Sequence, residues 1–156
     1  MTLYTLEFSQ KFPVSPEEIW NFISSPANLK SITPEFMGFE IIGKNLSQNM
    51  YPGMIISYHV RPVLGLKTLW VTEITQVKEL EYFVDDQRIG PYRLWHHEHY
   101  LKQIPGGVLM VDKVSYAPPL GVLGQLAKLL FIEKMLNRIF YYRRTKLEEK
   151  FGKFNI

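Results

Sequence analysis

Three of the four histidines lie within four residues of one another, in the segment Trp95-His-His-Glu-His99. On a β-strand, successive side chains point to opposite faces, so His97 and His99 share one face while His96 and Glu98 share the other. An imidazole pair of this kind can exchange protons near neutral pH, bind a metal ion or hydrogen-bond to a carboxylate. This segment is where the sequence concentrates its candidate chemistry.

The hairpin that follows is expected to bring these histidines next to a carboxylate. A two-residue turn at Gly106-Gly107 places Leu101 opposite Asp112, so that His99 and Asp112 become diagonal neighbours. Tyr116 lies on the same face of the second strand. The sequence therefore predicts a histidine and an aspartate within hydrogen-bonding reach of each other.

The preceding hairpin is expected to extend this face. A turn at Lys78-Glu79 pairs Trp70 with Gln87 and Thr72 with Asp85. Antiparallel pairing with the next strand then continues the face into the histidines. The predicted face mixes large aromatic groups with polar groups: Trp70, Phe83, Asp85, Gln87, Trp95, His97, His99, Asp112 and Tyr116.

These polar groups have two interpretations that involve no chemical step. In the first, they form a hydrogen-bonded network that fastens the sheet to a helix. Arg143 fits this interpretation, because a guanidinium on an otherwise apolar helical stripe needs a carboxylate such as Asp85 or Asp112. In the second, the same groups orient the polar end of a mostly apolar ligand.

A catalytic interpretation uses the same residues for acid–base chemistry. His99 held by Asp112 would serve as a general base. Tyr116 or Arg143 would polarise a carbonyl of the substrate. This interpretation fails if both ring nitrogens of each histidine are buried and bonded to protein. The sequence names His99 and Asp112 as catalytic candidates and establishes no catalytic set.

Metal binding is a separate possibility, because residues i and i+2 of a strand point the same way and both histidines are good ligands. Glu98 points away, so a third ligand would come from Asp112 or Asp85. No recognised metal motif covers this arrangement. The sequence therefore predicts neither a metal nor another cofactor.

Apolar periodicity and turn signals predict the elements that position these residues. Residues 3–12 suit a strand, and the capping box of Ser15 and Glu18 starts a helix at Pro16 that ends before Pro26, followed by a short helical turn. Short connections then favour an antiparallel meander of five or six strands. Its clearest strands are Ile55–Val60, Lys67–Val77, Glu81–Arg88, Arg93–Ile104 and Val108–Tyr116.

A long C-terminal helix is predicted from about Gly121 or Leu123 to Phe151. Its apolar positions recur at spacings of three and four, which gives one face that must be buried against the sheet. Arg143 interrupts this stripe. The stripe comprises Leu129, Ile132, Leu136, Phe140, Leu147 and Phe151.

Composition favours one α+β domain over residues 1–156, with 46% hydrophobic and 21% charged residues. A net charge of +3, spread along the chain, gives no support for nucleic-acid binding. The absence of cysteine excludes disulfides and thiol chemistry. No export signal and no apolar segment of about 20 residues is apparent, so a cytoplasmic protein without an integral membrane segment is expected.

The order of strand, helix, short helix, meander and long helix resembles the START-like superfamily, also called SRPBCC. The resemblance spans essentially the whole chain. This superfamily includes the polyketide cyclase and dehydrase group. Five segments are similar to a bacterial SRPBCC subgroup whose members are often labelled ligand-binding: Pro16 to Trp20, Pro26 to Pro34, Asp85 to Tyr92, Trp95 to His99 and Asp112 to Gly121.

This resemblance implies a helix-grip fold, in which a curved antiparallel sheet wraps around a long C-terminal helix, with two short helices after the first strand. It also implies a cavity for lipids, sterols, polyketides or other hydrophobic small molecules. The predicted wall comprises Trp70, Phe83, Trp95, Leu101, Leu136 and Phe140, and the predicted polar contacts are Asp85, Gln87, His97, His99, Asp112, Tyr116 and Arg143.

We therefore predict a small binding protein for an apolar or amphipathic molecule. The alternatives are a cyclase, dehydrase or hydrolase-type enzyme that uses the same cavity, and an interaction protein that acts through the basic end of its last helix. The sequence leaves the ligand and the oligomeric state open.

Overall fold

The computed structural model describes residues 2–43, 49–62, 65–119, 126 and 131–155. Within these residues, seven strands form one sheet: β1 (Tyr4–Phe12), β2 (Glu40–Ile42), β3 (Met54–Val60), β4 (Thr68–Lys78), β5 (Tyr82–Ile89), β6 (Leu94–Ile104) and β7 (Gly107–Ala117). All neighbouring strands are antiparallel, and their order is β1-β7-β6-β5-β4-β3-β2. The predicted meander is confirmed, and β1 closes it by pairing with β7.

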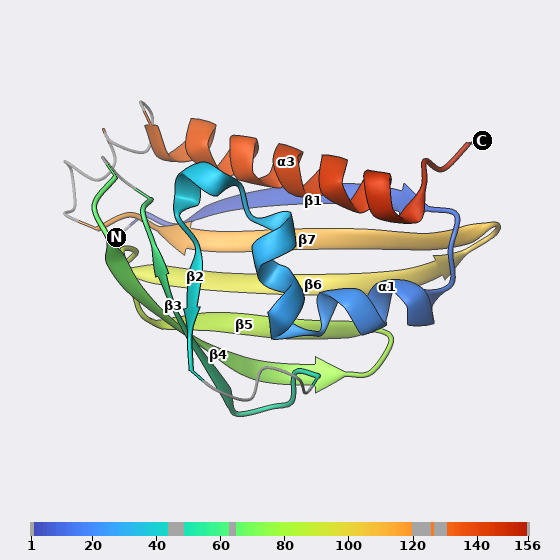
Figure 1. The fold of residues 1–156 in the computed structure, drawn as a ribbon, viewed down its shortest axis with the longest axis horizontal. Helices are drawn as coiled ribbons and strands as arrows, with labels where there is room; N and C mark the ends of the chain where they lie inside the picture. Colours follow the sequence, from blue (N-terminus) through green and yellow to red (C-terminus); the bar gives the residue numbers. More distant parts are fainter. Residues whose placement is uncertain (1, 44–48, 63–64, 120–125, 127–130, 156) are drawn as a thin grey trace.

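Four helical elements accompany the sheet in the part of the chain that the structure describes: α1 (Pro16–Ile23), the 3-10 helices η1 (Pro26–Ile32) and η2 (Glu35–Met37), and α3 (Glu133–Phe151). The predicted start of α1 is confirmed, because the hydroxyl of Ser15 accepts the backbone N–H of Glu18 at 3.3 Å. Figure 1 shows α3 running along the direction of β1 and β7, with α1 and η1 over the middle of the sheet. None of the helices in the described residues is long and apolar enough to cross a membrane.

The C-terminal helix buries the predicted apolar stripe. Leu136, Phe140 and Leu147 are buried along α3, and Ile132 is buried just before it. Phe151 ends the helix as predicted. Leu129 and the predicted starting points at Gly121 and Leu123 lie outside the described residues.

The core divides into two apolar clusters. One surrounds Phe12, Trp20 and Leu147, and the other surrounds Trp70, Trp95 and further residues of α3. Between them lie buried polar residues, which include His97, His99 and Asp112. Folding therefore removes polar groups from water together with the apolar surface, and those groups must find partners inside the protein.

The β6–β7 hairpin differs from the prediction in its register. Ile104 pairs with Gly107, so the turn is Pro105-Gly106 and not Gly106-Gly107. Gly106 has a φ of +79°, a left-handed conformation that glycine adopts without strain. Gly107 begins β7, and glycine is required there because a Cβ would overlap the carbonyl oxygen of Phe12.

This close approach predicts that Gly107→Ala destabilises the protein by about 2–3 kcal/mol through overpacking. Gly106→Ala is the control. The added Cβ would lie 3.7 Å from the ring of Phe154, which is an ordinary van der Waals distance. Only the left-handed backbone opposes that change, at about 1–2 kcal/mol. Urea unfolding of both variants measures the difference, and equal losses would contradict the account.

The β4–β5 hairpin also differs from the prediction. Lys78 pairs with Tyr82, so three residues form the turn, and Leu80 takes a left-handed φ of +64°. A register shift between Ile74 and Gln76 then pairs Ile74 with Asp85, where the sequence predicts Thr72 as the partner of Asp85. An irregularity of this kind re-aims neighbouring side chains and leaves no periodic signal in the sequence.

Candidate functional site

Four polar side chains from three adjacent strands meet on the concave face of the sheet. Pairing of β5 with β6 sets Asp85 opposite His97, and pairing of β6 with β7 sets His99 opposite Asp112. His99 and Asp112 are thus direct neighbours and not the predicted diagonal ones. The register error of two residues preserves the face, because side chains alternate with a period of two.

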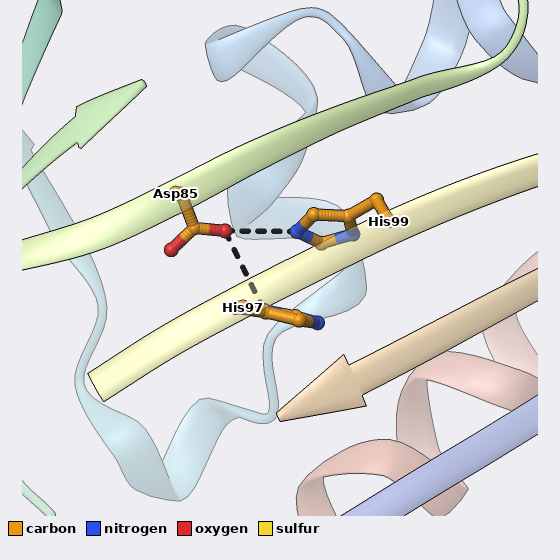
Figure 2. A group of neighbouring side chains, drawn as sticks. All are labelled: Asp85, His97 and His99. Carbon is orange, nitrogen blue, oxygen red and sulfur yellow. Dashed lines mark hydrogen bonds and ion pairs between the residues drawn. The ribbon is translucent and has the colours of Figure 1, made fainter. Parts of the chain in front are cut away.

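The two histidines and two aspartates form a closed ring of contacts. His97 Nε2 lies 3.1 Å and His99 Nδ1 2.8 Å from Asp112 Oδ1. On the other side, His99 Nε2 lies 2.8 Å and His97 Nδ1 3.5 Å from Asp85 Oδ2. Figure 2 shows the carboxylate of Asp85 pointing from β5 toward both imidazoles of β6. Every ring nitrogen of the pair therefore faces a carboxylate.

This ring, together with Arg143, forms what we call the polar cluster: Asp85, His97, His99, Asp112 and Arg143. Arg143 Nη1 lies 3.6 Å from Asp112 Oδ1. The predicted need of this arginine for a carboxylate is thus met by Asp112. The guanidinium also lies over the ring of Phe140, with 5.0 Å between the guanidinium carbon and the ring centroid.

Burial and charge act differently on the two histidines. Burial lowers the pKa of His97 to about 4, and the neighbouring His99 adds to this effect. Burial also opposes the charged form of His99, but hydrogen bonds with Asp112 and Asp85 outweigh it and raise its pKa. Burial opposes ionisation of both carboxyls as well, but the histidines lower the pKa of Asp85 and, more strongly, of Asp112.

The four contacts of the ring are unequal in length. Three are 2.8–3.1 Å long, and the fourth, from His97 Nδ1 to Asp85 Oδ2, is 3.5 Å. The pKa shifts favour the charged forms of His99, Asp85 and Asp112 and the neutral form of His97. The longest contact thus belongs to the histidine whose pKa is lowered.

An internal cavity of about 140 Å³ adjoins the polar cluster. Its wall is mostly apolar and aromatic, and all five residues of the polar cluster line it. The further predicted residues that line it are Trp70, Phe83, Trp95, Leu136 and Phe140. Aromatic side chains missed by the sequence analysis also contribute, namely Phe39, Tyr58 and Tyr92.

Three predicted residues lie elsewhere. The Gln87 side chain donates to the carbonyl of Tyr92 at 2.7 Å and accepts its N–H, so it fastens the loop between β5 and β6. Leu101 packs in the apolar cluster around Phe12. Tyr116 is fully buried outside the cavity lining, and its hydroxyl has no hydrogen-bond partner among the described residues. Its pKa is raised to about 12, mainly by burial.

A second hollow, of about 480 Å³, lies between β1 and α3. It is lined by Glu7, Phe8 and Gln10 from the strand and by Tyr141 and Arg144 from the helix. The two hollows share five lining residues: Met110, Asp112, Phe140, Arg143 and Leu147. These residues stand between the interior cavity and the strand–helix hollow. The periodicity of apolar residues within one segment does not predict such a hollow, because β1 and α3 are far apart in the chain.

The condition that excludes the catalytic interpretation is met for His99 and not for His97, whose Nδ1 lies 3.5 Å from Asp85 Oδ2. Both histidines are buried, with 4% of His97 and 9% of His99 exposed, and all four ring nitrogens face carboxylates. His99 has no nitrogen left to accept a proton from a substrate. Of its two suggested electrophilic partners, Tyr116 does not line the cavity, whereas Arg143 does. Arg143 is therefore placed for an electrophilic role, while His99 is held between two carboxylates.

No family model matches the sequence, and no curated protein matches it. Among solved structures, protein Ms6760 from Mycobacterium smegmatis is 16% identical, with 96% of both chains covered and a TM-score of 0.65. Ara h 8.0201 is also 16% identical, with 94% of this chain and 99% of that chain covered and a TM-score of 0.58. Major latex-like protein 151 from Panax ginseng is 7% identical, with 96% and 97% covered and a TM-score of 0.64.

The last two proteins have START-like folds. This chain has the START-like helix-grip fold. Its curved antiparallel sheet and C-terminal helix match the architecture that the sequence predicts. Identities of 7–16% extend this likeness to the fold alone. Because one START-like fold serves many functions, the function must be argued from the cavity and the polar cluster.

Proposed function

We propose that this protein binds a small apolar or amphipathic molecule in the cavity between its sheet and α3. The observation that carries the proposal is a hollow of about 140 Å³ with a mostly apolar wall and one polar side. Ligand sites typically combine such a wall with a few polar groups that fix orientation. The START-like fold is compatible with this role and does not establish it.

The volume narrows the class of ligand. Pockets for drug-sized ligands measure roughly 300–1,000 Å³, whereas a cavity of about 150 Å³ accommodates benzene. The interior cavity is therefore matched to a single ring or a short chain. A lipid, sterol or polyketide would have to extend past Phe140 and Arg143 into the strand–helix hollow, which adds about 480 Å³.

The polar side favours a ligand that carries a hydrogen-bond acceptor. Arg143 Nε is buried and has no hydrogen-bond partner among the described residues. A buried donor left without a partner costs about 1–3 kcal/mol, and a ligand oxygen at this position would recover part of that. A ring or short chain with a carbonyl, phenol or carboxylate group meets both the apolar and the polar requirement.

A thermal-shift screen of single-ring phenols, aromatic acids, fatty acids of graded length and sterols tests this proposal, with native mass spectrometry for stoichiometry. Small aromatic ligands with an acceptor are expected to bind at one per chain and to raise the melting temperature. Ligands too long for the interior cavity should bind more weakly. Failure of all classes to bind would overturn the proposal.

A variant that fills the cavity provides a matched test. Val60 is buried and lines the cavity, so Val60→Phe should abolish the ligand-induced shift. Leu69→Phe is the control, because Leu69 lies on the neighbouring strand with 40% of its surface exposed. It should leave the shift unchanged. An undiminished shift in folded Val60→Phe would place the ligand outside the cavity.

A further inference from the structure

We propose that Asp85, His97 and His99 form a binding site for one divalent transition-metal ion. This inference goes beyond ligand binding in the cavity. One nitrogen of each imidazole, Nδ1 of His97 and Nε2 of His99, faces the same carboxylate oxygen of Asp85 (Figure 2). The three potential ligand atoms lie within 4.8 Å of one another.

The distances suit a common metal ion. Zinc binds imidazole nitrogen and carboxylate oxygen at about 2.0–2.2 Å, so neighbouring ligand atoms in a tetrahedral or octahedral site lie about 3.0–3.4 Å apart. Asp85 Oδ2 is 2.8 Å from His99 Nε2 and 3.5 Å from His97 Nδ1. Shifts of a few tenths of an ångström would bring these two distances into that range. The two imidazole nitrogens lie within 4.8 Å of each other and must also approach for all three ligands to bind one ion.

The opposite side of the imidazoles is arranged as metal-binding histidines require. Metal-bound histidines usually donate their second N–H to a carboxylate, which fixes the tautomer and the ring orientation. Asp112 Oδ1 stands in this position for both rings, at 3.1 Å from His97 Nε2 and 2.8 Å from His99 Nδ1. Arg143 in turn lies 3.6 Å from the same oxygen and offsets its charge.

The longest contact of the ring leaves room for a cation. His97 Nδ1 and Asp85 Oδ2 are 3.5 Å apart, which is beyond the usual length of a direct hydrogen bond. Metal ligands must be deprotonated, so binding releases the proton of any N–H that points toward Asp85. Each histidine then keeps one N–H, directed at Asp112.

The donor set indicates the class of metal. Two imidazoles and one carboxylate suit zinc, iron, cobalt or nickel, whereas magnesium and calcium prefer sites built from oxygen alone. All three ligands line the cavity, so further coordination positions are open to water or to a ligand oxygen. The sequence alone predicts no metal because Asp85 comes from a different strand and completes no linear motif.

The test uses the full chain without an affinity tag, stripped of metal with a chelator. Titration with Zn²⁺ by calorimetry should saturate at one ion per chain, while Mg²⁺ and Ca²⁺ should give no saturable binding. Titration with Co²⁺ should produce visible absorption bands that one equivalent of Zn²⁺ removes. The cobalt spectrum of the unaltered protein needs no substitution, so a folding defect cannot imitate a negative result.

Substitutions assign the ligands. Asp85→Asn and His97→Asn should abolish the cobalt bands, and Asp112→Asn should weaken Zn²⁺ binding by about 10–100-fold through loss of histidine orientation. His96→Asn is the matched control. His96 also pairs with an aspartate, Asp86, at 2.7 Å, but on the outer face of the same two strands. The His96→Asn variant should bind Zn²⁺ with the affinity of the unaltered protein.

Three results would overturn the proposal. The first is a lack of stoichiometric binding of both Zn²⁺ and Co²⁺ by the unaltered protein. The second is unchanged binding in Asp85→Asn, with folding verified by circular dichroism. The third is an equal loss in His96→Asn, which would place the metal on the protein surface.

Discussion

Replacement of Asp112 by alanine is expected to lower the free energy of unfolding of the metal-free protein by about 3–5 kcal/mol, the usual cost of removing one partner from a buried ion pair. Asp112 is 3% exposed and accepts contacts from both histidines while lying beside Arg143. Without it, the charges of His99 and Arg143 stay buried with Asp85 as the remaining carboxylate of the polar cluster. Urea unfolding in the presence of a chelator measures the loss.

The outer face of the same strands supplies the control for this experiment. Asp86 pairs with His96 at 2.7 Å, but both side chains are partly exposed, at 25% and 36%. Asp86→Ala should therefore cost less than about 1 kcal/mol. If Asp112→Ala cost no more than Asp86→Ala, the polar cluster would contribute little to the fold and its charges would have to be solvated.

The face occupied by each polar residue was predictable from the sequence, whereas the pairing between strands was not. Alternation along β6 puts His97 and His99 on the same side whatever their partners are. A register error of two residues at Gly107 leaves that assignment intact. The error itself arose because Gly107 looks like a turn residue, while its real constraint is the backbone of Phe12, nearly a hundred positions away in the chain.

Elements with weak local signals escaped prediction for a different reason. β2 contains three residues, Glu40–Ile42, at the edge of the sheet, and among the described residues it pairs with β3 alone. A segment this short has no measurable periodicity. The shift near Thr75 and the left-handed Leu80 are likewise imposed by tertiary packing, because neither residue type favours an irregularity.

The polar cluster separates two apolar cores and links them physically. The ring of His99 stacks on Phe83 with 4.0 Å between centroids, while His97 meets Phe140 edge-on at 5.6 Å. Phe83 belongs to the core around Phe12, and Phe140 to the core around Trp70. A ligand or metal ion that alters the imidazoles therefore acts on both cores, and binding at this point should be visible as a change in global stability.

Phe140→Ala is expected to lower the free energy of unfolding by about 3–5 kcal/mol, as for other buried aromatic side chains. The Phe140 ring stacks on Phe8 at 4.2 Å between centroids and lines both the interior cavity and the strand–helix hollow. Its removal should join the two spaces. The variant is therefore predicted to bind larger apolar ligands than the unaltered protein does. An excess of such a ligand should restore about 1–3 kcal/mol of its free energy of unfolding.

Phe131→Ala is the matched control for this variant, because Phe131 lies two residues before α3, is 69% exposed and lines neither hollow. It should change stability by no more than about 0.5 kcal/mol and leave ligand size preference unaltered. Unfolding curves with and without indole, naphthalene derivatives and medium-chain fatty acids measure both effects. If Phe140→Ala lost stability but gained no affinity for the larger ligands, the two hollows would not communicate at Phe140, and the cavity would accept only small molecules.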